Sequence, residues 1–110
     1  MNIQIFGVKK CQSTRKAERY FKERAIPYQF VDLMVRGLSK GELNSVMAAV
    51  GPENLMDTEG KEYAKSHLKY MVHDREEALL AHPLLLKTPI VRNGPKATVG
   101  YCPEIWRGWS

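Results

Sequence analysis

Hydrophobic and polar residues alternate in two short stretches near the start of the chain, and a helical pattern separates them. Residues 2–6 read as a buried first strand, and residues 28–33 as a second strand. Between them, apolar side chains recur at helical spacing until the segment AIP at residues 25–27 ends the helix. This part predicts a right-handed parallel strand–helix–strand unit. The helix is expected to turn four side chains inward: Ala17, Tyr20, Phe21 and Arg24.

The middle of the chain, from about residue 39 to residue 82, carries only helical patterns. Ser39 and Glu42 have the spacing of a capping box, which predicts the start of a helix that Gly51 and Pro52 end. Further short helices are expected at residues 54–56, 63–71 and 74–82, the last capped by His73 or Asp74. The apolar side chains of this insertion are interpreted as core: Leu43, Val46, Met47, Val50, Met56 and Met71.

The last third of the chain predicts a hairpin followed by a short helix. Residues 89–92 and 97–101 flank the turn sequence NGPK, which is a strong hairpin signal. A helix is expected at residues 103–107, with Trp106 and Trp109 covering the sheet.

This order of elements is that of a thioredoxin-like fold. We therefore expect a single α/β domain over residues 1–110, with a four-stranded mixed sheet in the order second, first, third, fourth strand. The hairpin is expected to run antiparallel to the first two strands. Thioredoxin-like folds typically carry a cis-proline at the start of the third strand, and Pro89 would take that position beside Cys11.

Cys11 follows the first strand and lies at or just before the start of the helix, for which Ser13 or Thr14 can act as first residue. Unpaired backbone N–H groups and the helix dipole favour a thiolate there over a thiol. Lys9, Lys10 and Arg15 add positive charge nearby. Since the thiolate is the reactive form of cysteine, the pattern predicts a nucleophile.

The composition and charge of the chain argue against several classes of protein. The chain has 110 residues, a formal net charge of +5 and two cysteines, which is too few for a disulfide scaffold. No leader sequence or membrane-spanning run is visible, so a cytoplasmic protein that does not bind a membrane is expected. The basic residues are scattered among glutamates, and direct DNA binding is not expected. No zinc-ligand spacing appears, and a surface or capping role is assigned to three histidines: His67, His73 and His82.

Four segments carry a resemblance to a known family. They are FGVKKCQSTRKA at residues 6–17, LMDTEG at 55–60, PLLLKTPIV at 83–91 and VGY at 99–101. In order and spacing they resemble the arsenate reductase/Spx-like family of thioredoxin-fold proteins over nearly the whole chain. That resemblance implies two different activities, an arsenate reductase and a transcriptional regulator.

The reductases of this family use one cysteine, at the position matching Cys11, to attack arsenate while three arginines hold the oxyanion. At the matching positions this sequence has Glu59, Thr88 and Tyr101, so arsenate is not expected to be the preferred substrate. Five cations are candidates to replace those arginines in part: Lys9, Lys10, Arg15, Lys87 and Arg92.

The Spx-type regulators carry a Cys-x-x-Cys redox switch and bind RNA polymerase. Thr14 stands at the second cysteine position here, so the intramolecular switch is missing, although the segment at residues 100–101 is more Spx-like than reductase-like. Thr14 is either a hydrogen-bond donor to the thiolate or a helix cap, and Arg15 either stabilises an anion or lies in solvent. Ser13, Lys10 and Pro89 complete the set of candidate substrate-binding or thiolate-stabilising residues.

The resulting interpretation is a monothiol thiol–disulfide oxidoreductase with Cys11 as the nucleophile. The chain offers no second cysteine in the turn, so an external thiol is expected to resolve the adduct: glutathione as co-substrate, another small thiol or a glutaredoxin-like protein. Cys102 is a second, weaker candidate for the resolving thiol. A redox-sensitive regulator that binds RNA polymerase or another protein is the alternative, and an interaction domain with an inert cysteine is a third.

Overall fold

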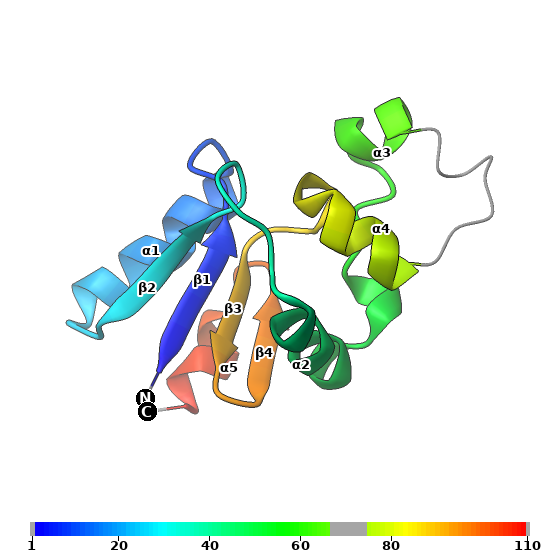
Figure 1. Ribbon diagram of the computed structural model, residues 1–110. Helices are drawn as coiled ribbons and strands as arrows, with labels where there is room; N and C mark the ends of the chain where they lie inside the picture. Colours follow the sequence, from blue (N-terminus) through cyan, green and yellow to red (C-terminus); the bar gives the residue numbers. More distant parts are fainter. Residues whose placement is uncertain (1, 67–74, 110) are drawn as a thin grey trace.

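The computed structural model describes residues 2–66 and 75–109, and its centre is a four-stranded sheet (Figure 1). The strands are β1 (Ile3–Gly7), β2 (Tyr28–Asp32), β3 (Ile90–Asn93) and β4 (Lys96–Val99). Their order across the sheet is β2-β1-β3-β4, as the sequence predicts. The mixed sheet, its strand order and the flanking helices confirm the thioredoxin-like fold.

Strand direction brings four strand termini to one edge of the sheet. β1 and β2 are parallel, β3 is antiparallel to β1, and β4 is antiparallel to β3. The expectation that the whole hairpin opposes the first two strands is therefore wrong for β4, because the tight turn reverses the chain once more and β4 runs in the direction of β1. Consequently the ends of β1, β2 and β4 lie at the same edge as the start of β3.

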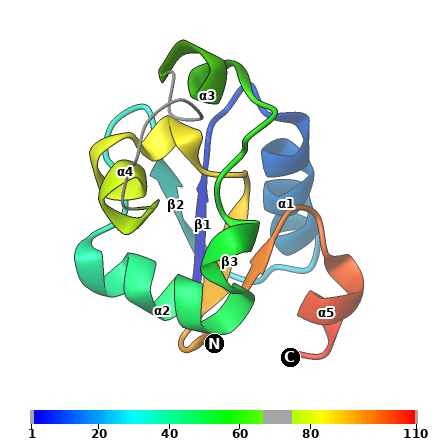
Figure 2. The same cartoon turned by 90° about the vertical axis from the view of Figure 1, so that its right-hand side faces the viewer.

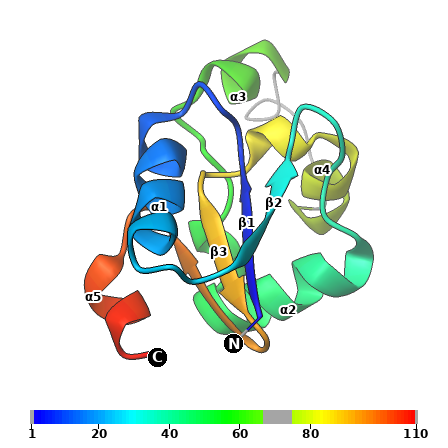
Figure 3. The ribbon, with the colours of Figure 1, turned by 90° about the vertical axis from the view of Figure 1, so that its left-hand side faces the viewer.

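Two helical layers cover the sheet (Figures 2 and 3). On one face lie α1 (Gln12–Glu23) and α5 (Pro103–Arg107), and on the other α2 (Lys40–Val50) and α4 (Arg75–Ala81). Each helical layer packs against one face of the sheet and encloses a separate hydrophobic core. The α1 side buries Ile3, Ile5, Ala17, Tyr20, Phe21, Val91 and Trp106. The α2 side buries a larger set that includes Phe6, Val31, Leu43, Val46, Leu55, Leu79, Leu85 and Ile90.

The inward side of α1 differs from its predicted side at one position. Ala17, Tyr20 and Phe21 are buried as expected, but Arg24 is exposed at the end of the helix and its guanidinium lies 3.8 Å from the centre of the Tyr20 ring. A charged head at a helix end stays in water while its stem covers apolar surface. Glu18 is buried instead, with 7% of its surface exposed.

The C-terminal helix covers the sheet as predicted. Trp106 is buried, and its indole N–H donates a hydrogen bond of 2.8 Å to the Thr98 hydroxyl. Its ring lies 5.2 Å from both the Tyr20 and the Phe21 rings, centre to centre.

The segment between β2 and β3 is helical as expected. The capping box of Ser39 and Glu42 opens α2, and Gly51 ends it with a φ of 87°. The short helix η1 (Pro52–Asn54) and the helix α3 (Lys61–Ser66) each begin two residues earlier than predicted. The short helix η3 (Pro83–Leu85) was not predicted. Met71, His67, His73 and Asp74 lie outside the described residues. No helix in the described ranges is long and apolar enough to cross a membrane.

Candidate active site

Cys11 lies at the N-terminal cap of α1, after the loop that follows β1. Its backbone N–H donates to the Val8 carbonyl at 3.0 Å, and its carbonyl accepts from the Arg15 N–H at 3.1 Å. The side chain is half-buried at the edge of the α2-side core. The sequence predicted this position, and the structure confirms it.

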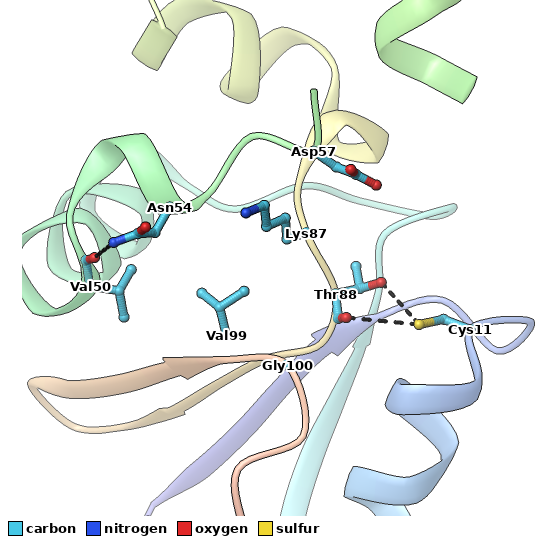
Figure 4. Close-up of a pocket in the computed structure, with 8 residues that line it drawn as sticks. All are labelled: Cys11, Val50, Asn54, Asp57, Lys87, Thr88, Val99 and Gly100. Carbon is cyan, nitrogen blue, oxygen red and sulfur yellow. Dashed lines mark hydrogen bonds between the residues drawn. The ribbon is translucent and has the colours of Figure 1, made fainter. Parts of the chain in front are cut away.

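Thr88 contacts the Cys11 sulfur from the segment before β3 (Figure 4). The Thr88 hydroxyl donates a hydrogen bond of 3.2 Å to Sγ, and the thiol of Cys11 donates a longer one of 3.8 Å to the Thr88 carbonyl. The Thr88–Pro89 peptide bond is cis, as expected for this fold, and Pro89 immediately precedes β3. The side chain and the backbone of one residue thus flank the candidate nucleophile.

Thr14 lies behind Cys11 in the first turn of α1 and is fully buried. Within the described ranges, 2–66 and 75–109, its hydroxyl has no hydrogen-bond partner. A buried hydroxyl without a partner is unfavourable, and an ionised sulfur beside it would supply the missing acceptor. The arrangement therefore favours the thiolate form of Cys11.

These contacts lower the pKa of the Cys11 thiol. Partial burial by itself raises the pKa of its thiol, but hydrogen bonding to the ionised sulfur outweighs it and leaves the pKa below its ordinary value. The donors are the hydroxyls of Thr14 and Thr88 and the backbone N–H groups of Thr14 and Ser13. Of the predicted stabilising residues, the structure therefore brings Ser13 and Thr14 to the sulfur and adds Thr88.

Gly7 makes room for the Thr14 side chain. A methyl group at Gly7 would lie 2.5 Å from Thr14 Oγ1 and 2.7 Å from Cγ2, both well inside contact distance. We expect Gly7→Ala to lower the free energy of unfolding in urea by about 1–3 kcal/mol, because Thr14 would have to move in a closed core. Gly41→Ala is the matched control: nothing lies within 4 Å of its added methyl group, so its stability should stay the same or rise. Equal losses in both variants would contradict this account of Gly7.

The loop before Cys11 is tied to the sheet through Lys9. Its ammonium group lies 3.4 Å from a carboxylate oxygen of the buried Glu18 and 4.2 Å from the centre of the Phe30 ring. Glu18 also accepts a hydrogen bond of 2.9 Å from the Tyr28 hydroxyl. The Arg15 guanidinium donates to the Lys9 carbonyl at 2.9 Å. Lys9 and Arg15 thus fix the loop and the helix to each other, and neither is bonded to the sulfur.

The contact between Tyr28 and Glu18 makes the stability of the fold depend on pH. Burial and the neighbouring Glu18 carboxylate raise the pKa of Tyr28 from 10.0 to about 12. The fold therefore favours neutral Tyr28, and this stabilisation is complete below pH 10 and is lost as the pH rises through about 12. In urea titrations, the free energy of unfolding should fall more steeply across this range in the wild type than in Tyr28→Phe. Parallel curves would show that the hydroxyl contributes nothing.

A cavity of about 660 Å³ opens beside Cys11 at this edge of the sheet. Val50, Val99 and Gly100 form an apolar wall, and Asn54, Asp57 and Lys87 supply polar groups. Figure 4 shows the Lys87 ammonium pointing toward Asn54 and away from the sulfur. The site therefore combines a thiol of lowered pKa with a space of the size that small ligands occupy.

Comparison with known proteins places the chain. A profile of the ArsC family matches residues 6–109. The chain belongs to the ArsC family. It is 30% identical over 106 residues to the global transcriptional regulator Spx 2 of Oceanobacillus iheyensis, covering 92% of this chain and 78% of that protein. It is 28% identical over 108 residues to the uncharacterized protein YusI of Bacillus subtilis, covering 92% of each.

Among solved structures, a putative arsenate reductase from Yersinia pestis matches with a TM-score of 0.82 at 22% identity, covering 96% of this chain and 98% of that one. This match shows the shared fold. Together with the family profile, it confirms the resemblance that the four sequence segments indicate.

The positions where ArsC-family reductases are expected to carry arginine are used differently here. Thr88 is bonded to Cys11, and Tyr101 stacks edge-on against Trp106, 5.6 Å between ring centres, on the α1 side of the sheet. The backbone N–H of Glu59 donates to the Asp57 carboxylate at 3.3 Å in a turn. Neither Glu59 nor Tyr101 lines the cavity beside Cys11.

The cations that were candidates to replace those arginines lie at different distances from Cys11. Arg92 pairs with Gln4 near the start of β1, at the opposite edge of the sheet, and donates to its side chain at 2.9 Å. Its candidacy is therefore wrong, because strand register fixes it far from Cys11. Lys87 lines the cavity beside Cys11, and Lys10 lines a neighbouring one.

Cys102 caps α5 and packs against the α1-side core, whereas Cys11 packs against the α2-side core. Its thiol donates to the Val99 carbonyl at 3.3 Å. Burial, with the nearby Glu104 carboxylate, raises the pKa of the Cys102 thiol. The topology brings the end of β4 to the Cys11 edge as expected, but the two sulfurs face different layers.

Sequence reasoning missed Thr88 as a hydrogen-bond donor and missed Asn54 and Asp57 as cavity residues. Thr88 carried one usable signal, because the residue before the expected cis-proline of this fold lies opposite the nucleophile. Asn54 and Asp57 come from the helical insertion, whose placement over the sheet no local pattern specifies.

Proposed function

We propose that this ArsC-family chain is a monothiol thiol–disulfide oxidoreductase in which Cys11 is the nucleophile. One observation carries the proposal: the half-exposed sulfur at the start of α1 accepts the Thr88 hydroxyl and lies beside the unpartnered Thr14 hydroxyl. Both groups stabilise negative charge on sulfur, which is the reactive form. The cavity beside it gives a substrate access.

The reaction proceeds in two exchanges. The Cys11 thiolate attacks one sulfur of a disulfide, forms a new S–S bond and releases the other half as a thiolate, which takes a proton from water. A second, external thiolate then attacks the substrate-derived sulfur and releases the Cys11 thiolate. The second thiol is external because Thr14 occupies the place where an internal resolving cysteine would stand. Glutathione is the proposed second thiol, acting directly or through a glutaredoxin-like protein.

A regulator is the second candidate function, since the chain is 30% identical to a protein named as a global transcriptional regulator. In that case the Cys11 adduct would be a signal, and RNA polymerase would be the partner to test. The two functions differ in a simple observable. A reductase regenerates Cys11 and turns over with excess thiol, whereas a sensor accumulates the adduct without turnover and co-purifies with polymerase subunits.

Thr14 provides the test of thiolate activation. Iodoacetamide alkylation against pH should place the pKa of wild-type Cys11 below about 8.5, the free-thiol value. Thr14→Val should raise that pKa by about one unit or more, because a hydrogen bond to a charged group is worth about 1.5–3 kcal/mol.

At a pH well below the pKa of Cys11, where the sulfur is a neutral thiol, the same substitution should leave the free energy of unfolding unchanged or higher, since it removes a buried hydroxyl without a partner. Thr14→Ser keeps the hydroxyl and should retain the low pKa. A Thr14→Val variant that loses stability while its Cys11 pKa stays constant would assign Thr14 to the structure of the helix start. A wild-type pKa at or above the free value would refute the activated thiolate.

A further inference from the structure

A second cavity of about 450 Å³ adjoins the one beside Cys11. Asp57 and Thr88 line both cavities, so the two spaces lie on either side of these residues. Cys11 lines only the first cavity, while its neighbour Lys10 lines the second. The two spaces therefore meet at the residue that is bonded to the nucleophile.

The second cavity has an apolar floor and a charged rim. Val8 and Leu86 are buried, and the partly buried Leu84 extends the floor. The rim carries three lysines and two acids: Lys10, Lys61, Lys65, Asp57 and Glu62. Positive charge is in excess, and lysine ammonium groups bind carboxylates and phosphates as point charges.

Thiol–disulfide exchange requires space for two groups at once. The attacking, attacked and departing sulfurs lie close to one line during the exchange, so the departing half lies beyond the attacked sulfur, away from Cys11, and needs a space of its own. The half that becomes bonded to Cys11 belongs in the cavity that Cys11 lines. The departing half then extends across Thr88 into the second cavity.

We propose that the second cavity binds the departing half of the substrate, and that this half is a small thiol with an aliphatic stem and an anionic end. The proposal rests on the proposed function and names its substrate class. The Cys11–S bond forms as the substrate S–S bond breaks, and the departing thiolate takes a proton from water. Its carboxylate or phosphate is held by Lys61 and Lys65, and its stem lies on Val8 and Leu86.

The test measures the second-order rate of mixed-disulfide formation at Cys11 with three disulfides. Glutathione disulfide has carboxylate ends, coenzyme A disulfide has phosphate ends, and bis(2-hydroxyethyl) disulfide is neutral. The variant is Lys61→Gln/Lys65→Gln, which leaves Lys10 beside Cys11 unchanged. The control is Lys22→Gln/Lys96→Gln, which removes the same charge at the opposite edge of the sheet, in the last turn of α1 and the first residue of β4.

The Lys61→Gln/Lys65→Gln variant should react about three- to tenfold more slowly than the wild type with at least one anionic disulfide. Its rate with the neutral disulfide should match that of the wild type, and the control should change the anionic rates by less than about twofold. A loss confined to one anionic disulfide would identify carboxylate or phosphate as the recognised group. Equal losses in variant and control would overturn the inference and leave the proposed function intact. A wild-type Cys11 that forms no adduct with any of the three would refute the proposed function itself.

Discussion

Cys11→Ser should reduce glutathione-dependent turnover of a small disulfide by roughly a thousandfold or more, to the rate of the uncatalysed exchange. A hydroxyl cannot form the mixed disulfide, and loss of a covalent nucleophile costs at least this much in enzymes that depend on one. The measurement is NADPH consumption coupled through glutathione reductase, with bis(2-hydroxyethyl) disulfide as substrate.

The fold should survive this substitution, because serine is close in size to cysteine and the side chain is only half-buried. Cys102→Ser is the matched control and should keep most of the turnover, since that sulfur faces the α1 side. Turnover that persists in Cys11→Ser and disappears in Cys102→Ser would reverse the roles assigned to the two cysteines.

Arsenate reduction should be at least about a thousandfold below that of an ordinary reductase. Each charge-assisted contact that is lost costs about 1.5–3 kcal/mol, so three missing arginines amount to about 4.5–9 kcal/mol. In this chain Thr88 is bonded to Cys11, Tyr101 lies on the other face of the sheet, and Glu59 adds a negative charge.

The assay couples arsenate to NADPH consumption through glutathione and glutaredoxin. The disulfide assay on the same protein sample serves as the control for an active Cys11. Arsenate turnover of about 1 per second or faster would contradict this prediction, because that rate is ordinary for enzymes. It would also require another cation to bind the oxyanion, for which Lys87 and Lys10 are the candidates.

Local pattern predicted most of the fold because local chemistry determines it. Alternating apolar residues, the capping box of Ser39 and Glu42, and the hairpin turn each specify an element within a few positions. The errors occur where the chain leaves an element. β4 ends before its predicted limit because Gly100 turns the chain with a φ of 85°, and Arg24 lies in solvent at the end of α1.

The candidate site likewise contains residues that the local sequence predicts and residues that it does not. Cys11 and Thr14 could be predicted as site residues because both lie at the start of the same helix, which the local sequence specifies. The hydrogen bond from Thr88 to Cys11 spans 77 positions, and only the pairing of β1 with β3 brings these residues together. Glu18 gave no sign of burial, since an acid in a charged helix reads as exposed. Its burial depends on Lys9 and Tyr28, which come from a loop and a strand.

Intact-mass analysis of the reaction with glutathione disulfide tests the central claim most directly. The account predicts a rapid gain of one glutathione per chain, which peptide mapping assigns to Cys11, followed by complete loss of the adduct when reduced glutathione is added. Both steps should be faster than those of a free thiol at the same pH. An adduct that forms no faster than on a free thiol, that maps to Cys102, or that resists added glutathione would contradict the assignment of Cys11 as the nucleophile of a monothiol exchange.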